Sequence, residues 1–87
     1  MERSLEDLFK QAALDSKTLT EKPDNETLLS LYSLYKQGSH GDVTEDAPSN
    51  PFDFVARAKH EAWSAIKGKS KEAAMQEYID MIGRLKG

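Results

Sequence analysis

Apolar residues recur every three or four positions along most of the chain, which is the period of an amphipathic α-helix. Breaks in this pattern divide the chain into four segments, which we predict to be helices at residues 4–19, 24–37, 50–68 and 70–85. The sequence therefore predicts an all-α fold, with residues 1–87 forming a single domain.

Residue types that favour helix ends occur at the boundaries of these segments. Ser4, Asp24, Asn50 and Ser70 are suited to accept hydrogen bonds from the first free N–H groups of the helices. Gly38 is suited to end the second helix, because glycine readily adopts the left-handed conformation that follows many helices.

Residues 38–50 are rich in glycine, serine, aspartate, proline and asparagine, and are predicted to form a loop. This loop is long for a helix connection in a small bundle. When extended it can reach about 40 Å, whereas the second predicted helix is only about 20 Å long. The chain can therefore return along the second helix, so that the third runs parallel to it. We predict a four-helix bundle in up-down-down-up order.

The composition excludes several classes of protein. The net charge is −3, which argues against a nucleic-acid-binding protein, since these usually carry a basic excess. The chain has no cysteine, so neither disulfides nor cysteine zinc sites can stabilise the fold. No apolar run approaches the roughly 20 residues of a membrane span, and the N-terminus lacks the apolar stretch of a signal peptide. We therefore expect a cytoplasmic protein.

The second predicted helix carries Tyr32, Tyr35 and Lys36 at neighbouring positions on its surface. Phenol rings can stack on a flat base, their hydroxyls can donate to phosphate, and a lysine ammonium supplies a compact positive charge. This mixture suits a nucleotide. From spacing alone, however, half-buried tyrosines and a solvated lysine are the favoured interpretation, and Lys59 on the third helix is an ordinary surface lysine.

The histidines and serines offer no catalytic arrangement. His40 and His60 fall in different elements, and neither has a carboxylate at a clear partner spacing. The serines lack the sequence of a nucleophile elbow, and the chain has no glycine-rich phosphate loop. We therefore expect neither an enzyme nor a metal-binding protein.

Five short pieces of the sequence occur in a fixed order. They are YSLYKQ at residues 32–37, GDV at 41–43, AKHEAW at 58–63, KGKSKEAAM at 67–75, and Tyr78 with Ile79. Each piece alone is a weak signal, but together and in register they are specific. With the similarity extending from Phe9 to Leu85, the chain resembles the acyl-CoA-binding protein family.

The resemblance implies a four-helix bundle that binds one long-chain fatty acyl-CoA. It implies that Tyr35 packs on the adenine ring. It also implies that Tyr32, Lys36 and Lys59 hold the phosphates of the head group, chiefly the 3′-phosphate. Further family contacts on the first and last helices complete the set of expected ligand-binding residues, which is Lys17, Tyr32, Ser33, Leu34, Tyr35, Lys36, Lys59 and Tyr78.

The resemblance also identifies structural positions and departures from the family pattern. Trp63 matches a structural tryptophan. His60 stands where the family usually has a tryptophan, Ala47 where an arginine often precedes the proline, and Ser16 where an apolar residue is usual. These departures concern ligand preference and affinity rather than the fold. The apolar seam expected between the terminal helices consists of Phe9, Ala13, Leu19, Ile79, Ile82 and Leu85.

The function implied by the resemblance is that of an intracellular carrier and pool buffer for acyl-CoA. We expect a monomer without cofactor or metal, which makes at most transient contact with membranes or with enzymes that use acyl-CoA. The alternative is a helical protein-interaction module in which ligand binding is reduced or lost. The intact tyrosines and lysines favour the carrier, because a decayed site would not need them. A thioesterase is disfavoured by the lack of a nucleophile–base pair.

Overall fold

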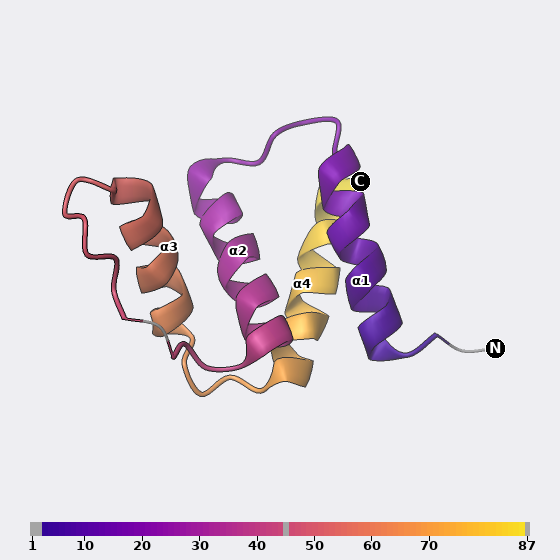
Figure 1. Cartoon of the computed structure of the whole chain (residues 1–87). Coiled ribbons are helices and arrows are strands. Elements are labelled where there is room, and N and C mark those ends of the chain that lie inside the picture. The colour runs from indigo at the N-terminus through magenta and orange to yellow at the C-terminus, as the bar shows by residue number, and fades with distance from the viewer. Residues whose placement is uncertain (1–2, 45, 87) are drawn as a thin grey trace.

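The structure, a computed structural model, describes residues 3–44 and 46–86, and no strand occurs among them. The all-α prediction is therefore confirmed. The elements, drawn in Figure 1, are α1 (Leu5–Asp15), the short 3₁₀ helix η1 (Ser16–Thr18), α2 (Asn25–His40), α3 (Phe54–Ala65) and α4 (Lys71–Lys86).

The four α-helices run in the predicted up-down-down-up order (Figure 1). α1 and α4 run in one direction, and α2 and α3 run in the other. The chain leaves the end of α2, passes back along the molecule through a loop that includes residues 41–44 and 46–53, and enters α3 parallel to α2. The length of this loop is what makes the parallel arrangement possible.

Three of the predicted helix caps are present. The side-chain oxygens of Ser4, Asp24 and Ser70 each accept a hydrogen bond from the backbone N–H three residues further along, at 3.1, 2.8 and 3.1 Å. Each bond satisfies one of the N–H groups that have no partner inside the helix.

The expected end of the second helix at Gly38 was wrong. α2 continues to His40, and the left-handed glycine after it is Gly41, with a φ of 86°. Gly38 serves packing instead, because a Cβ atom at this position would lie 3.1 Å from side-chain carbons of both Met75 and Phe9. The close approach of neighbouring helices, rather than a turn, therefore favours glycine at this position.

The expected cap of the third helix at Asn50 was also wrong. α3 begins at Phe54, and its cap is Asp53, whose carboxylate accepts from the Ala56 N–H at 3.1 Å. Asn50 instead accepts from the Phe52 N–H at 2.9 Å, which is a local turn that precedes the helix.

The first helix is shorter than expected, because α1 ends at Asp15 and is followed by η1. Two hydroxyls mark this change. Ser16 Oγ donates to the carbonyl of Ala13 at 2.7 Å, and Thr18 Oγ1 donates to that of Asp15 at 2.9 Å. Such side-chain bonds to the backbone compete with continuation of the helix.

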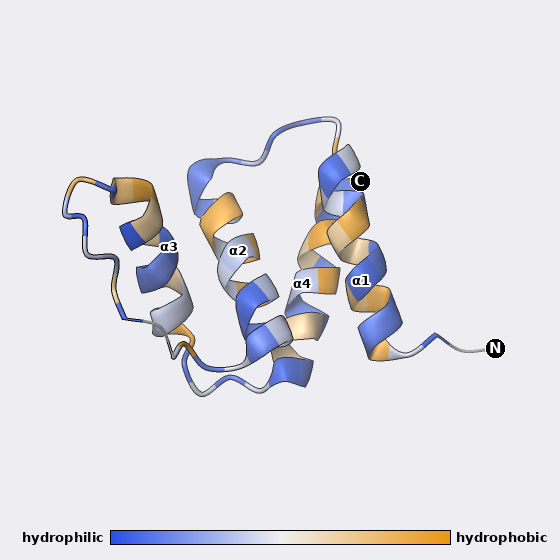
Figure 2. Cartoon of the chain, viewed as in Figure 1, coloured by the Kyte–Doolittle hydropathy of each residue, from blue (hydrophilic) through white to orange (hydrophobic). Residues whose placement is uncertain are grey.

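α4 lies at the centre of the packing, against both α1 and α2, while α3 packs against α2. Of the expected seam, Ile82 is fully buried, but Leu85 is 38% exposed and Leu19 faces a groove described below. The core cluster consists of Phe9, Ala12, Leu31, Leu34, Ala74, Tyr78 and Ile82. Figure 2 shows hydrophobic and hydrophilic residues alternating along α1, α2 and α4.

Candidate ligand-binding site

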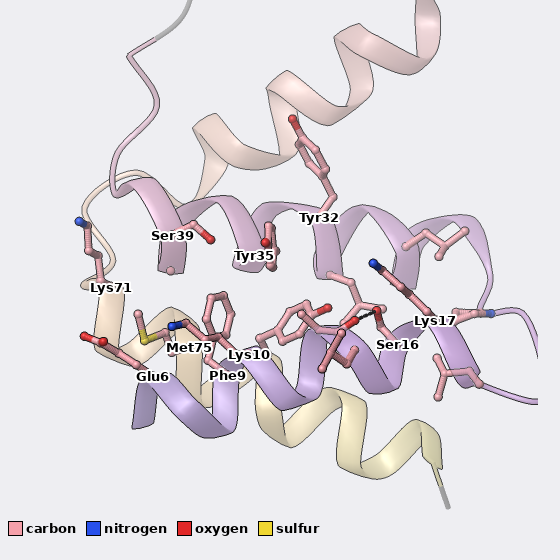
Figure 3. Close-up of a pocket in the computed structure, with 18 of the residues that line it drawn as sticks. Glu6, Phe9, Lys10, Ser16, Lys17, Tyr32, Tyr35, Ser39, Lys71 and Met75 are labelled. Atoms are coloured by element: carbon pink, nitrogen blue, oxygen red, sulfur yellow. Dashed lines mark hydrogen bonds between the residues drawn. The ribbon is translucent and has the colours of Figure 1, made fainter. Parts of the chain in front are cut away.

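A groove with a volume of about 1180 Å³ opens between α1 and α2, with residues of α4 at its floor (Figure 3). We call it the α1–α2 groove. Its size is sufficient for a ligand larger than a simple metabolite. Most of its exposed wall is apolar, and the apolar and aromatic lining residues are Phe9, Ala13, Leu14, Leu19, Pro23, Leu28, Leu31, Tyr32, Tyr35, Met75 and Tyr78.

Three aromatic rings, one from each of α1, α2 and α4, meet in this groove. Phe9 stacks on Tyr35, with 5.4 Å between ring centroids and an interplanar angle of 26°. Tyr78 meets Phe9 edge-on at 5.3 Å and lies 5.9 Å from Tyr35. Tyr35 remains 41% exposed, so part of a supported aromatic ring is open to a planar ligand group.

Two lysine ammonium groups lie beside the ring of Tyr32. Lys59 Nζ, from α3, is 5.3 Å from the ring centroid, and Lys36 Nζ, from α2 itself, is 5.9 Å from it. Lys36 Nζ also lies 5.7 Å from the ring of Trp63. The negative faces of the rings attract these cations and concentrate positive charge between α2 and α3. This arrangement suits a phosphate or another compact anion.

A third cation, Lys17, belongs to η1 and lines the same groove. Figure 3 shows its side chain reaching from the end of α1 across the groove toward α2. The groove therefore combines an apolar interior with ammonium groups contributed by η1 and α3.

Tyr78 lies at the floor of the groove and is only 4% exposed. Burial raises the pKa of its phenol, and hydrogen bonding to Ser16 acts in the opposite direction. The phenol therefore keeps its proton at neutral pH and can donate a hydrogen bond. Ser16 thus has a polar partner on α4.

A buried polar network around Gln37 fixes α3 against α2. The Gln37 side chain is fully buried, and its Oε1 accepts from Trp63 Nε1 at 3.1 Å. Its Nε2 donates to Asp42 Oδ1 at 2.8 Å and to the carbonyl of Lys69 at 2.7 Å. The indole N–H also donates to the carbonyl of Gly41 at 3.0 Å. We call these contacts the Gln37 network.

Asp42 extends the network to the connection between α3 and α4. Its Oδ1 accepts from the backbone N–H of Gly68 at 2.8 Å. This bond, followed by the bond from Gln37 and the charge of Lys67, lowers the pKa of the Asp42 carboxyl. The network therefore joins the C-terminal ends of the parallel helices α2 and α3, next to Lys36 and one helical turn from Lys59.

The chain was compared with known proteins. The model of the family described as acyl CoA binding protein matches residues 6–82. This chain belongs to the acyl-CoA-binding protein family.

Relatives of similar length support this assignment. The Acyl-CoA-binding protein of Dictyostelium discoideum is 46% identical over 77 residues, which are 88% of this chain and 90% of that protein. Acyl-CoA-binding domain-containing protein 6 of Arabidopsis thaliana is also 46% identical, over 81 residues that cover 93% and 87% of the two chains. The crystal structure of Oryza sativa Acyl-CoA-Binding Protein 2 superposes with a TM-score of 0.88 at 43% identity, covering 94% of this chain and 90% of that one.

Five of the residues expected to bind ligand line the groove of this acyl-CoA-binding protein family member: Lys17, Tyr32, Tyr35, Lys59 and Tyr78. Lys36 lies beside Tyr32 and Trp63 instead of lining the groove itself. The ligand contacts of these residues stay predictions.

Ser33 and Leu34 have different surroundings from the rest of the expected set. They are 4% and 5% exposed and do not line the groove. Ser33 Oγ donates to the carbonyl of Ser30 at 2.9 Å, and Leu34 belongs to the core cluster. The buried positions of Ser33 and Leu34 therefore do not support the expectation that they contact the ligand.

The sequence analysis did not predict two lysines of the groove, nor that Gln37 is the buried centre of a hydrogen-bond network between α2 and α3. Lys10 lines the groove from α1 and Lys71 from the first residue of α4 (Figure 3). Lys10 could have been found, because it shares a helical stripe with Ala13 and Lys17.

Within the described residues, no group of three histidine, aspartate or glutamate side chains is placed to hold a metal ion. Nor is any helix in this part of the chain long and apolar enough to cross a bilayer.

Proposed function

We propose that this protein binds long-chain fatty acyl-CoA esters without a covalent bond and acts as a carrier and buffer of the acyl-CoA pool. The observation that carries the proposal is the pair of ammonium groups, Lys36 and Lys59, beside Tyr32 at an aromatic-lined groove. An acyl-CoA combines phosphates, a planar adenine and an apolar tail. The site offers a complementary surface for each of these parts.

The head group is assigned to the junction of α2 and α3. The phosphates bind Lys36, Lys59 and the Tyr32 hydroxyl, and the adenine stacks on the exposed part of Tyr35. Lys17 adds a further positive charge from η1. A charge-assisted hydrogen bond contributes about 1.5–3 kcal/mol, so a few such bonds account for tight binding of the head group.

The acyl tail is assigned to the apolar wall of the α1–α2 groove. This wall includes Leu28 and Leu31 of α2 and Ala13 and Leu14 of α1. Each methylene that leaves water gains roughly 0.8 kcal/mol until the groove is full. Affinity should therefore rise with tail length and then level off.

The groove is proposed to bind its ligand without converting it. Its hydroxyl side chains include Ser16, which donates to the Ala13 carbonyl, and Ser39, and no imidazole lines it in the described part of the chain. A serine without a nearby base is a poor nucleophile toward a thioester. We propose that the protein acts as a monomer in the cytoplasm.

Calorimetric titration tests this function. We expect palmitoyl-CoA to bind far more tightly than palmitate, because palmitate lacks the nucleotide that the lysines and tyrosines hold. Free CoA, which lacks the tail, should also bind weakly. Equal affinities for palmitoyl-CoA and palmitate would overturn the head-group assignment, and no binding of any of the three would favour the protein-interaction module.

A further inference from the structure

Three apolar side chains near the start of α3 are exposed to solvent. Phe52 is 80% exposed, Phe54 is 72% exposed and Val55 is 66% exposed. We call these three residues the α3 apolar tip. Large apolar side chains that cluster in solvent mark an interaction site more often than isolated ones do. Figure 2 shows this apolar colour at the first turn of α3 and at the end of the loop before it.

The tip lies at the same end of the molecule as the apolar end of the groove. The first turns of α2 and α3 and the last turn of α1 are all found at this end (Figure 1). Leu14 and Leu28, which line the groove, are 57% and 36% exposed. Exposed apolar residues of three helices therefore lie toward one end of the molecule.

The size of the tip favours a lipid surface over a protein partner. A specific protein interface buries about 800 Å² and 20–30 residues on each partner, far more than three side chains can supply. A bilayer surface needs no matching shape and accepts a few apolar side chains at shallow depth. The nearby charges are mixed, since Asp53 lies between the two phenylalanines and Arg57 follows Val55 by two residues. Mixed charges suit zwitterionic headgroups better than anionic ones.

We propose that Phe52, Phe54 and Val55 insert at shallow depth into a zwitterionic phospholipid bilayer and bring the apolar end of the groove to that surface. A long-chain acyl-CoA partitions into bilayers through its tail, so contact of this kind lets the ligand pass into the groove without crossing open water. The proposal rests on the proposed function for the identity of the ligand. The contact is weak and reversible, because only three side chains enter the lipid.

The test compares the double variant Phe52→Ser/Phe54→Ser with the parent and with Leu8→Ser. Leu8 is 39% exposed on α1, does not line the groove, and lies toward the opposite end of the molecule. Partition of the three proteins onto phosphatidylcholine vesicles is measured, and so is the rate at which each takes up palmitoyl-CoA from those vesicles. Thermal melting confirms that the variants are folded.

We expect the double variant to lose vesicle partition by about tenfold or more, because both phenyl rings are removed from the contact. Its rate of uptake from vesicles should fall in parallel, while Leu8→Ser behaves like the parent. Uptake by the parent should also become faster as the vesicle concentration increases. Equal partition and uptake by the double variant and the parent would overturn the proposal.

Two controls separate this proposal from its alternatives. Binding of the shorter, water-soluble octanoyl-CoA needs no membrane, so it should be the same in all three proteins. If octanoyl-CoA and palmitoyl-CoA both fail to bind the parent, the proposed function fails. If both bind but the double variant behaves like the parent on vesicles, only the membrane contact fails. A parent that sediments as a dimer, with a double variant that is monomeric, would assign the tip to a second copy and overturn the lipid proposal.

Discussion

The two sides of α2 are held in different ways. On one side, α1, α2 and α4 share the apolar core cluster, which includes Phe9, Leu31 and Ile82. On the other side, α3 is attached to α2 largely through Trp63 and the polar Gln37 network, and Trp63 is not part of that cluster. Most of the stability is therefore expected on the first side, whereas the cations of the proposed head-group site depend on the second.

This difference separates the effects of substitutions. Apolar burial is non-directional and tolerates small shifts, but a buried hydrogen-bond network requires each partner to stay in place. A change in the core should lower stability and leave the affinity of the folded protein largely intact. A change in the Gln37 network should affect both properties.

The largest expected effect is that of Trp63→Ala. Trp63 is 3% exposed, and truncation of a buried aromatic residue costs about 3–5 kcal/mol of unfolding free energy. The change also removes the N–H donor to Gln37, so Lys59 loses its fixed position beside Tyr32. Chemical denaturation and acyl-CoA titration should both show losses.

The matched substitution in the core is Ile82→Ala, because Ile82 is 1% exposed and lies on α4, whereas Lys59 lies on α3. It should cost about 2–5 kcal/mol of stability. Titration at a temperature where the variant is fully folded should give nearly the parent affinity. An equal loss of affinity in both variants would remove the distinction between the two sides.

Tyr35→Ala is expected to weaken binding by about 1–3 kcal/mol, by analogy with bases that stack on aromatic platforms. The ring is 41% exposed but also supports Phe9 at 5.4 Å, so a modest loss of stability accompanies the change. Tyr35→Phe keeps the ring and is the control. If Tyr35→Ala binds acyl-CoA as well as Tyr35→Phe does, the adenine is not held there.

Two glycine substitutions test the packing of α1, α2 and α4, and they should change the unfolding free energy in opposite directions. Gly38→Ala places a Cβ 3.1 Å from the Phe9 ring, which is held between two tyrosines, so we expect destabilisation by about 1–3 kcal/mol. Gly83→Ala meets no atom within 4 Å in the exposed part of α4 and should stabilise by about 0.5–1 kcal/mol. Thermal melting of both variants decides whether Gly38 is required by packing.

The smallest expected effect is the pH dependence of the α3 attachment. The pKa of Asp42 is lowered from its ordinary value of 3.8, chiefly by the Gly68 N–H and then by Gln37. Its charge therefore contributes stability that is fully present above pH 3.8 and is lost as the pH falls through the lower folded-state pKa. Asp42→Asn should melt below the parent at neutral pH, and the difference should shrink in acid. A difference that does not depend on pH would mean that the charge has no part in the network.

Local features of the sequence predicted most of the fold. Asp24 and Ser70 cap their helices through partners three residues away, so their roles can be read from short segments. Gly38 could not be interpreted in this way, because its neighbours Phe9 and Met75 lie on other helices. The neighbouring sequence does not distinguish a glycine that ends a helix from one that allows two helices to pack closely.

The candidate site was less predictable from local pattern. From their spacing alone, Lys36 and Lys59 were interpreted as solvated surface lysines. Only the family resemblance predicted that both belong to one binding site. The Gln37 network was missed because Gln37 contacts Trp63 and Lys69, which are 26 and 32 residues further along the chain. A buried glutamine on an otherwise apolar helix face signals that a partner exists, but it does not identify that partner.

The most direct test of the proposed site is the affinity of Lys36→Ala and Lys59→Ala for palmitoyl-CoA, measured beside their melting temperatures. Both ammonium groups lie beside Tyr32, at 5.9 and 5.3 Å from its ring centroid. Each variant should melt close to the parent and lose about 1.5–3 kcal/mol of binding free energy, which is roughly a tenfold or greater rise in Kd. Variants that melt like the parent and still bind palmitoyl-CoA with the parent affinity would contradict the assignment of the head group to this site.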